Sequence, residues 1–260
     1  IAPAIGATFL LSDTIKTTAE INILSEVEKS AYYIAEAVAV QTPFVLLSFC
    51  IVTLAIIFAF VKLPSIIKTV SNSGYREVLK NKVLMMGAFA ILVYVGAEVA
   101  IGSYLVNYFI DMDMHLIIQS TPWINNIALN ILNTDLASLD KRAIVGAFVT
   151  FYWSGAMIGR FVGAYLTNKN NPSKVLGVFA IGALLLIIIS MNTVGLISMW
   201  SILAVGLFNS IMFPTIFTLS IQDIEELKPQ ASGILCTMIV GGAIIPPLYG
   251  FLTDLSGFKT

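Results

Sequence analysis

A single acid in the middle of a long apolar segment is the residue of this sequence best suited to chemistry. Glu98 lies near the centre of residues 83–109, VLMMGAFAILVYVGAEVAIGSYLVNYF. As a helix this run is long enough to cross a hydrocarbon core of roughly 30 Å. An acid at that depth is costly, faces protein or water rather than lipid, and typically marks a functional site. It could carry a proton, bind a polar solute, or hold two helices together.

Tyr94 is predicted to lie beside this acid. On a helical wheel its side chain falls within about 60° of Glu98, on a face that also carries small residues. Asn107 lies on the opposite side of a straight helix and would join this face only if Gly102 and Ser103 broke the helix. The sequence therefore ranks Tyr94 above Asn107 as a contact to a bound solute.

A second polar group lies in the middle of another apolar run, residues 194–221. Asn209 and Ser210 are followed by Pro214, which lacks the N–H that would pair with the Ser210 carbonyl. A neutral amide offers two donors and an acceptor, which suits sugar hydroxyls. The alternative for Asn209 is a hydrogen bond between two helices.

Other motifs indicate close helix packing or movement. Glycines recur every four residues in the span 143–167, which lets a neighbouring backbone approach closely: Gly155, Gly159 and Gly163. Tyr152 and Trp153 in this span could form an aromatic platform or simply pack. Arg160, near the end of the span, suits gating or anchoring. The last span has two glycines before two prolines, which favours a kink or a gate: Gly241, Gly242, Pro246 and Pro247.

The elements that position these residues are membrane spans. Hydrophobic residues make up 58% of the chain and charged residues 11%, which indicates a polytopic membrane protein. We expect a partial span at 1–11, an exposed or interfacial helix within 12–41, and a span at 43–62 that starts at Pro43. Further spans are expected at 83–109, 143–167 and 231–252, and the run 175–221 must be two spans with a hairpin near 191–193. The chain is interpreted as an internal fragment of a longer protein.

Lysine and arginine give the orientation. The loop 63–82 is the most basic in the chain, and alternation places 167–174 and 222–230 on the same side. That side carries nine of the 14 Lys and Arg residues. By the positive-inside rule, it is cytoplasmic.

Catalytic and metal-binding motifs are missing from the sequence. It has no HExxH, no phosphate-binding loop and no cluster of metal ligands, so no enzyme, metal or cofactor is predicted. Cys50 and Cys236 lie in apolar runs as small hydrophobes, and His115 is expected in a loop. Nothing indicates nucleic-acid binding.

Four segments together resemble one family: VGAEVAIGSYLVNYF (95–109), YWSGAMIGRFVGAYL (152–166), GLFNSIMFPTIFTLSI (206–221) and GGAIIPPLYGFLTDLSG (241–257). They are similar to the L-fucose permease family, which includes bacterial glucose/galactose transporters and belongs to the major facilitator superfamily. The resemblance implies an all-α integral membrane protein of two six-helix halves, of which this chain covers the end of helix 5 through helix 11. Residues 1–62 would end the amino-terminal half, 63–82 form the central cytoplasmic loop, and 83–260 supply helices 7–11.

The resemblance also implies a function. It predicts a symporter of the bacterial inner membrane, monomeric when full length, that takes up a monosaccharide with a proton by alternating access, Na⁺ being the alternative ion. The family's proton-carrying acids lie in the other half, so Glu98 would read sugar hydroxyls or hold a gate. The external loop 110–141 is longer than is usual in such permeases, and the segment around Arg160 resembles the superfamily's glycine-and-arginine loop signature but lacks the aspartate often found there. The alternatives are a carrier of the same fold for another small solute, or a non-transporting sugar sensor or scaffold.

Overall fold

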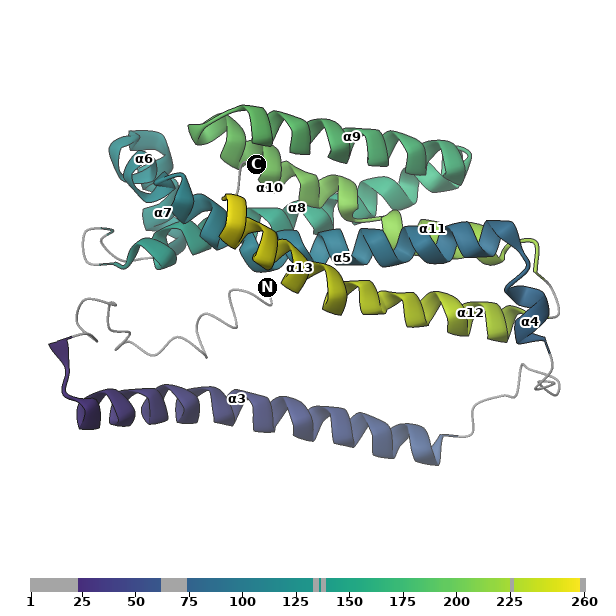
Figure 1. The fold of residues 1–260 in the computed structure, drawn as a ribbon, viewed down its shortest axis with the longest axis horizontal. Helices are drawn as coiled ribbons and strands as arrows, with labels where there is room; N and C mark the ends of the chain where they lie inside the picture. Colours follow the sequence, from purple (N-terminus) through teal and green to yellow (C-terminus); the bar gives the residue numbers. More distant parts are fainter. Residues whose placement is uncertain (1–22, 62–73, 133–135, 137–138, 225–226, 258–260) are drawn as a thin grey trace. The chain divides into compact units, whose positions relative to one another are not determined.

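The computed structural model describes residues 23–61, 74–132, 136, 139–224 and 227–257. All regular elements in these ranges are helices (Figure 1). The chain divides into two compact units, residues 1–69 and 70–260.

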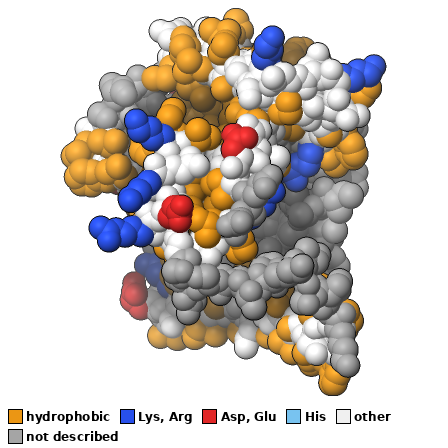
Figure 2. All heavy atoms as spheres, turned by 90° about the vertical axis from the view of Figure 1, so that its right-hand side faces the viewer, with side chains coloured by type: hydrophobic (Ala, Val, Ile, Leu, Met, Phe, Trp, Pro, Cys, Tyr) orange, Lys and Arg blue, Asp and Glu red, His pale blue; other side chains and the backbone are white. Residues whose placement is uncertain are grey.

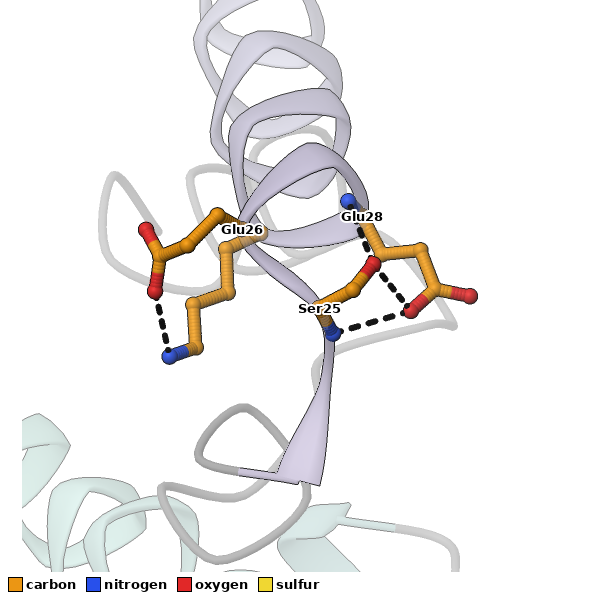
Figure 3. Close-up of polar contacts among 4 residues, drawn as sticks. Ser25, Glu26 and Glu28 are labelled. Atoms are coloured by element: carbon orange, nitrogen blue, oxygen red, sulfur yellow. Dashed lines mark hydrogen bonds and ion pairs between the residues drawn. The ribbon is translucent and has the colours of Figure 1, made fainter.

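The first unit contains one long helix, α3 (Glu26–Phe60). It starts at a capping box (Figure 3). The Ser25 hydroxyl accepts a hydrogen bond from the Glu28 N–H at 3.4 Å, and the Glu28 carboxylate accepts one from the Ser25 N–H at 3.0 Å. These bonds satisfy backbone donors that a helix start leaves free.

The start of α3 differs from the prediction. The span expected at 43–62 is the apolar part of this helix, Phe44–Phe60, but the helix runs through Pro43 instead of starting there. The prediction of a first-turn proline is wrong because the capping box at Ser25 supplies a stronger start signal than Pro43 does. The partial span expected at 1–11 lies outside the described residues.

Five segments of the second unit are long and apolar enough to cross a membrane. They are α5 (Lys82–Asp111), α8 (Lys141–Lys169), α9 (Pro172–Asn192), α10 with α11 (Gly195–Asn209 and Met212–Ile221), and α12, η2 and α13 (Lys228–Thr237, Met238–Val240 and Gly241–Ser256). They match the five spans predicted between 83 and 252. Asparagine or aspartate side chains cap the starts of α5, α8 and α9.

The hairpin predicted near 191–193 is confirmed. Helix α9 ends at Asn192 and α10 begins at Gly195, which has a positive φ of 65°. The Asn192 amide donates to the Ile188 carbonyl at 2.8 Å, and the Thr193 hydroxyl donates to the Ile189 carbonyl at 2.6 Å. The second bond satisfies one of the carbonyls that the end of α9 leaves free.

Two spans are interrupted in the membrane. The first break separates α10 from α11 at Ser210 and Ile211, where Pro214 cannot pair with the Ser210 carbonyl. The second is the 3₁₀ turn η2, just before Gly241, while both prolines of the last span lie inside α13. The break in the last span thus precedes its glycines.

The long loop 110–141 contains two short helices, α6 (Met114–Ser120) and α7 (Pro122–Leu132). Helix α7 buries Ile124 and Ala128 in the core, while Trp123 is half-exposed and stacks on Trp200 with ring centroids 6.4 Å apart. His115, expected in a loop, lies in α6. The apolar part of this loop is therefore packed as a helix against the bundle.

The main core joins α5, α8, α9 and α10 with α6 and α7. Its largest fully buried side chains include Phe109, Phe148, Tyr152 and Leu203. A smaller core lies between α5 and α12 and takes in Val78 of the short helix α4 (Tyr75–Val78). Helix α5 takes part in both cores and is the central element of the second unit.

Basic side chains are exposed at the end of the second unit where α5, α9 and α12 begin. Figure 2 views the molecule from this side and shows Lys and Arg side chains spread over it. The exposed residues at this end include Arg76, Lys80, Lys82, Lys169, Lys174 and Lys228. This is the end that the positive-inside rule places in the cytoplasm.

Candidate functional site

Tyr94 of α5 connects two helices in the middle of the membrane. Its hydroxyl donates a hydrogen bond of 2.8 Å to the backbone carbonyl of Asn209, the last residue of α10. That carbonyl is available because the helix breaks just beyond it, so it has lost its usual partner four residues on. The break in the span therefore creates the acceptor that Tyr94 uses.

Asn209 extends this contact to a third helix. Its side-chain amide donates to the Tyr152 hydroxyl of α8 at 3.1 Å. Tyr152 is fully buried and Asn209 is 6% exposed, so both polar groups depend on this bond. The interhelical alternative for Asn209 is thus present in the structure.

Glu98 lies one turn from Tyr94 on α5, with its carboxyl beside the Tyr94 phenol. The side chain is half-buried, unlike the closed pair of Asn209 and Tyr152. Arg160 of α8 is exposed and lies within electrostatic range of Glu98. We call Glu98, Tyr94, Tyr152 and Asn209 the midspan cluster.

Asn107 does not join the midspan cluster. Helix α5 is unbroken from Lys82 to Asp111, so Gly102 and Ser103 do not turn the later residues toward Glu98. Asn107 is exposed on another face. The structure therefore separates it from the three other residues predicted to contact a solute.

The glycines of α8 lie against α10 and the start of α11. A Cβ on Gly159 would overlap the Leu207 carbonyl, and one on Gly163 would overlap the Ile211 side chain. Gly155 also faces Leu207, and Gly206 of α10 faces the Tyr152 carbonyl in return. The two backbones are in direct contact beside the midspan cluster.

The glycines of the last span lie against α5. A Cβ on Gly241 would overlap the Leu92 carbonyl, and Gly242 faces Val95 and Val99. Pro246 is buried and Pro247 is exposed within α13. Close contact of α5 with α13 thus occurs at the level of Tyr94 and Glu98.

Two features of the site received little weight in the sequence. Trp153 is 45% exposed, its ring edge lies 3.7 Å from where a Cβ on Gly102 would be, and it stands at 90° to the buried Tyr152 ring. Tyr108 of α5 bonds Ser198 of α10 at 2.8 Å in a second polar cluster. The sequence signal for this second cluster was the spacing of the two tyrosines, since Tyr108 lies two heptads after Tyr94 on the same side of α5.

Comparisons with known proteins find relatives that are named as sugar transporters. No family model matches the sequence. A glucose/galactose transporter of Brucella abortus (biovar 1, strain 9-941) is 38% identical over 99% of this chain and 54% of its own length. A putative glucose/galactose transporter of Helicobacter pylori J99 is 34% identical over 98% and 55%, and the L-fucose-proton symporter of Escherichia coli K12 is 25% identical over 99% and 55%. The chain spans about half the length of these relatives.

The solved structures that match this chain are also transporters of this kind. A crystal structure of the E. coli fucose:proton symporter matches with a TM-score of 0.70 and 25% identity, over 100% of this chain and 60% of that one. A crystal structure of a major facilitator superfamily transporter in the outward conformation matches with a TM-score of 0.70 and 24% identity, over 98% and 58%.

Proposed function

We propose that this chain is part of a proton-coupled monosaccharide transporter that works by alternating access. The chain is a multi-pass membrane homologue of the glucose/galactose transporters and the L-fucose-proton symporter. It has the major facilitator fold. These relatives are transporters rather than enzymes. The relatives' names support a hexose or 6-deoxyhexose as the substrate and a proton as the coupling ion. Na⁺ is the alternative ion.

The observation that carries the proposal is the position of Glu98. A half-buried acid in the middle of α5 is surrounded by neutral hydrogen-bonding groups rather than by a direct ion pair in the described residues. A carboxylate can accept hydrogen bonds from two vicinal hydroxyls at once. This is the chemistry that binding of an uncharged sugar requires.

Tyr94 lies beside this acid, and the other polar residues of the midspan cluster bond one another. The Tyr94 hydroxyl and the Asn209 amide donate to protein partners, which leaves Glu98 as the group best placed for a ligand. In this conformation Tyr94 and Asn209 contribute to substrate binding by positioning Glu98. Asn107 contributes least. Preorganised groups of this kind lower the cost of binding.

Alternating access requires helices that can shift as packed units. At the glycine contacts between α8 and α10 and between α5 and α13, no side chain blocks one helix from shifting along the other. The interruptions at Ser210 and in η2 serve as hinges within their spans. Arg160 acts as a gate residue in the electrostatic range of Glu98.

The proposed organisation follows the relatives. Residues 1–62 end the amino-terminal half, 63–82 form the central cytoplasmic loop, and 83–260 form helices 7–11 of the other half. We propose that the full-length protein is a monomer in the bacterial inner membrane; the bacterial origin of the relatives supports the bacterial location. Its substrate site requires both halves.

Uptake by a Glu98→Gln variant tests the proposal. We expect loss of hexose uptake by about tenfold to a hundredfold in proteoliposomes, because the amide lacks the charged acceptor. Glu77→Gln, an exposed acid of α4, is the matched control and should transport normally. Wild-type rate and affinity in Glu98→Gln would contradict the role of Glu98.

Counterflow with labelled fucose, galactose and glucose identifies the substrate. Exchange of a non-sugar solute alone would favour a different carrier of the same fold. Sugar binding without uptake by the wild-type protein would favour a sensor or scaffold.

A further inference from the structure

The short helix α4 is held against the start of α12, at the end of the second unit that carries the exposed basic residues. The chain turns at Gly74, whose φ of 141° suits glycine, and a Cβ there would lie 2.7 Å from the Leu227 side chain. Val78 of α4 is 3% exposed and belongs to the smaller core together with Leu235 of α12. Helix α4 is therefore a packed part of the bundle and presents its other side chains in a fixed place.

The exposed side chains of α4 lie at the edge of the apolar part of the bundle. Tyr75 and Leu79 are both about half-exposed, and the Tyr75 hydroxyl lies 3.8 Å from where a Cβ on Gly233 of α12 would be. Exposed apolar side chains begin on α5 at Val83, which places the boundary of the hydrocarbon layer near the start of that helix. Tyrosine is enriched at this boundary because its ring is apolar and its hydroxyl is polar. The segment 75–82 thus lies at the depth of the lipid headgroups.

Three basic side chains lie in this segment, and we call them the α4 patch: Arg76, Lys80 and Lys82. All three are exposed, and none of them forms an ion pair with another described residue. Their loop, residues 63–82, contains four basic residues and one acid, Glu77. Figure 2 faces this end and shows Lys and Arg side chains next to hydrophobic ones. The α4 patch is accordingly a positive surface with apolar side chains beside it.

An anionic phospholipid has the complementary groups. Its phosphate accepts hydrogen bonds from lysine and arginine, and a guanidinium can bind two phosphate oxygens at once. Its acyl chains can cover Tyr75 and Leu79, which a small soluble anion would leave exposed. Clusters of basic residues directly cytoplasmic of a membrane span attract lipids of this kind.

We propose that the α4 patch binds the headgroup of an anionic phospholipid in the cytoplasmic leaflet. The bound headgroup bridges α4 and the start of α5, and so keeps the carboxyl-terminal end of the loop 63–82 against α12. The inference concerns the lipid around the protein and does not depend on which solute the protein transports.

Native mass spectrometry of the full-length protein in detergent tests this, with phosphatidylglycerol and phosphatidylcholine of the same acyl chains as probes. The wild type should bind phosphatidylglycerol about tenfold more tightly than phosphatidylcholine. Arg76→Gln/Lys80→Gln should lose most of this preference, because two of the three charges of the patch are removed. The matched control, Lys169→Gln/Lys174→Gln, removes two exposed charges from the same end at the turn between α8 and α9. It should keep the preference within about twofold.

Two outcomes would overturn the proposal. Equal losses in both double variants would mean that lipid responds only to the general positive charge of this end. A wild type without a preference for phosphatidylglycerol would mean that the patch is already neutralised by the acids of the loop 222–230. If Arg76→Gln/Lys80→Gln does not fold, Lys80→Gln/Lys82→Gln removes the same charge and should show the same loss. Hexose uptake is measured separately, so its absence would overturn the proposed function and leave the lipid site standing.

Discussion

Two tyrosines of α5 form polar links to α10, and their surroundings differ. Tyr94 bonds the Asn209 carbonyl beside Glu98, in the midspan cluster. Tyr108 bonds the Ser198 hydroxyl next to Ser190, in what we call the outer cluster. The two tyrosines lie two heptads apart, so they share one side of the same helix.

The outer cluster is closed. Tyr108, Ser190 and Ser198 are all buried, the Ser190 hydroxyl donates to the Ser198 carbonyl at 3.1 Å, and the Ser198 hydroxyl donates to the Ser190 carbonyl at 2.8 Å. These bonds join the two helices of the α9–α10 hairpin to α5. The midspan cluster instead ends in a half-buried acid. A network without a charge and without an exposed member stabilises the fold, whereas one that leaves an acid available can bind a ligand.

The same substitution at both tyrosines gives the largest expected contrast. Tyr94→Phe should lower sugar affinity by about tenfold, because Glu98 loses a polar neighbour that holds it in place. Tyr108→Phe should leave affinity within about twofold, since its cluster has no ligand-binding group. Binding calorimetry on the two purified variants measures both.

Equal losses of sugar affinity in Tyr94→Phe and Tyr108→Phe would contradict the distinction between the two clusters. If Tyr108→Phe weakened sugar binding as much as Tyr94→Phe, the outer cluster would belong to the binding site. Tyr249→Phe, on α13 near Tyr104, is a further control for removal of a tyrosine hydroxyl from a neighbouring helix.

Coupling between Asn209 and Tyr152 is the second expected effect. Asn209→Ala leaves the buried Tyr152 hydroxyl without its donor and should lower the free energy of unfolding by about 1–2 kcal/mol. Adding Tyr152→Phe should restore part of that loss, because both partners are then apolar. Thermal unfolding of the two single variants and the double variant gives the interaction energy.

Additive losses would mean that the bond of 3.1 Å contributes nothing to stability. Uptake measured on the same variants tells whether the pair also positions Glu98. A full rescue of stability without rescue of uptake would assign the pair to the binding site.

Local patterns were sufficient for much of the fold. The hairpin near Asn192 followed from length, because a single helix over 175–221 would be more than twice as long as the hydrocarbon core is thick. The shared face of Tyr94 and Glu98 followed from the helical period. The missing donor to the Ser210 carbonyl followed from Pro214, because it is a property of one residue, whereas the helix break at Ser210 and Ile211 was not predicted.

Contacts between helices did not follow from the sequence. The pairing of Asn209 with Tyr152 depends on how α8 and α10 are rotated against each other, and 57 residues separate the two positions. Gly102 and Ser103 permit a break in α5 that would bring Asn107 toward Glu98, yet the helix is continuous from Lys82 to Asp111. Ser190 and Ser198 gave no signal, because single serines in apolar spans have no period that distinguishes a buried network from isolated residues.

The smallest expected effects come from single serines of the outer cluster. Ser198→Ala removes one of two donors to the Ser190 carbonyl, the other being the Tyr108 hydroxyl, and it also removes a hydroxyl partner of Tyr108. Ser190→Ala removes the donor to the Ser198 carbonyl and a contact of 3.2 Å to Tyr108. Hydrogen bonds between membrane helices contribute about 0.6 kcal/mol on average, so we expect losses of about 1 kcal/mol for Ser198→Ala and about half that for Ser190→Ala. Thermal unfolding in detergent measures this order, with Ser201→Ala of α10 as a matched control. Both serines contact α5 at Tyr108, ten residues after Glu98, so sugar affinity should stay unchanged. A shift in affinity without a shift in stability would reverse the assignment of the two clusters.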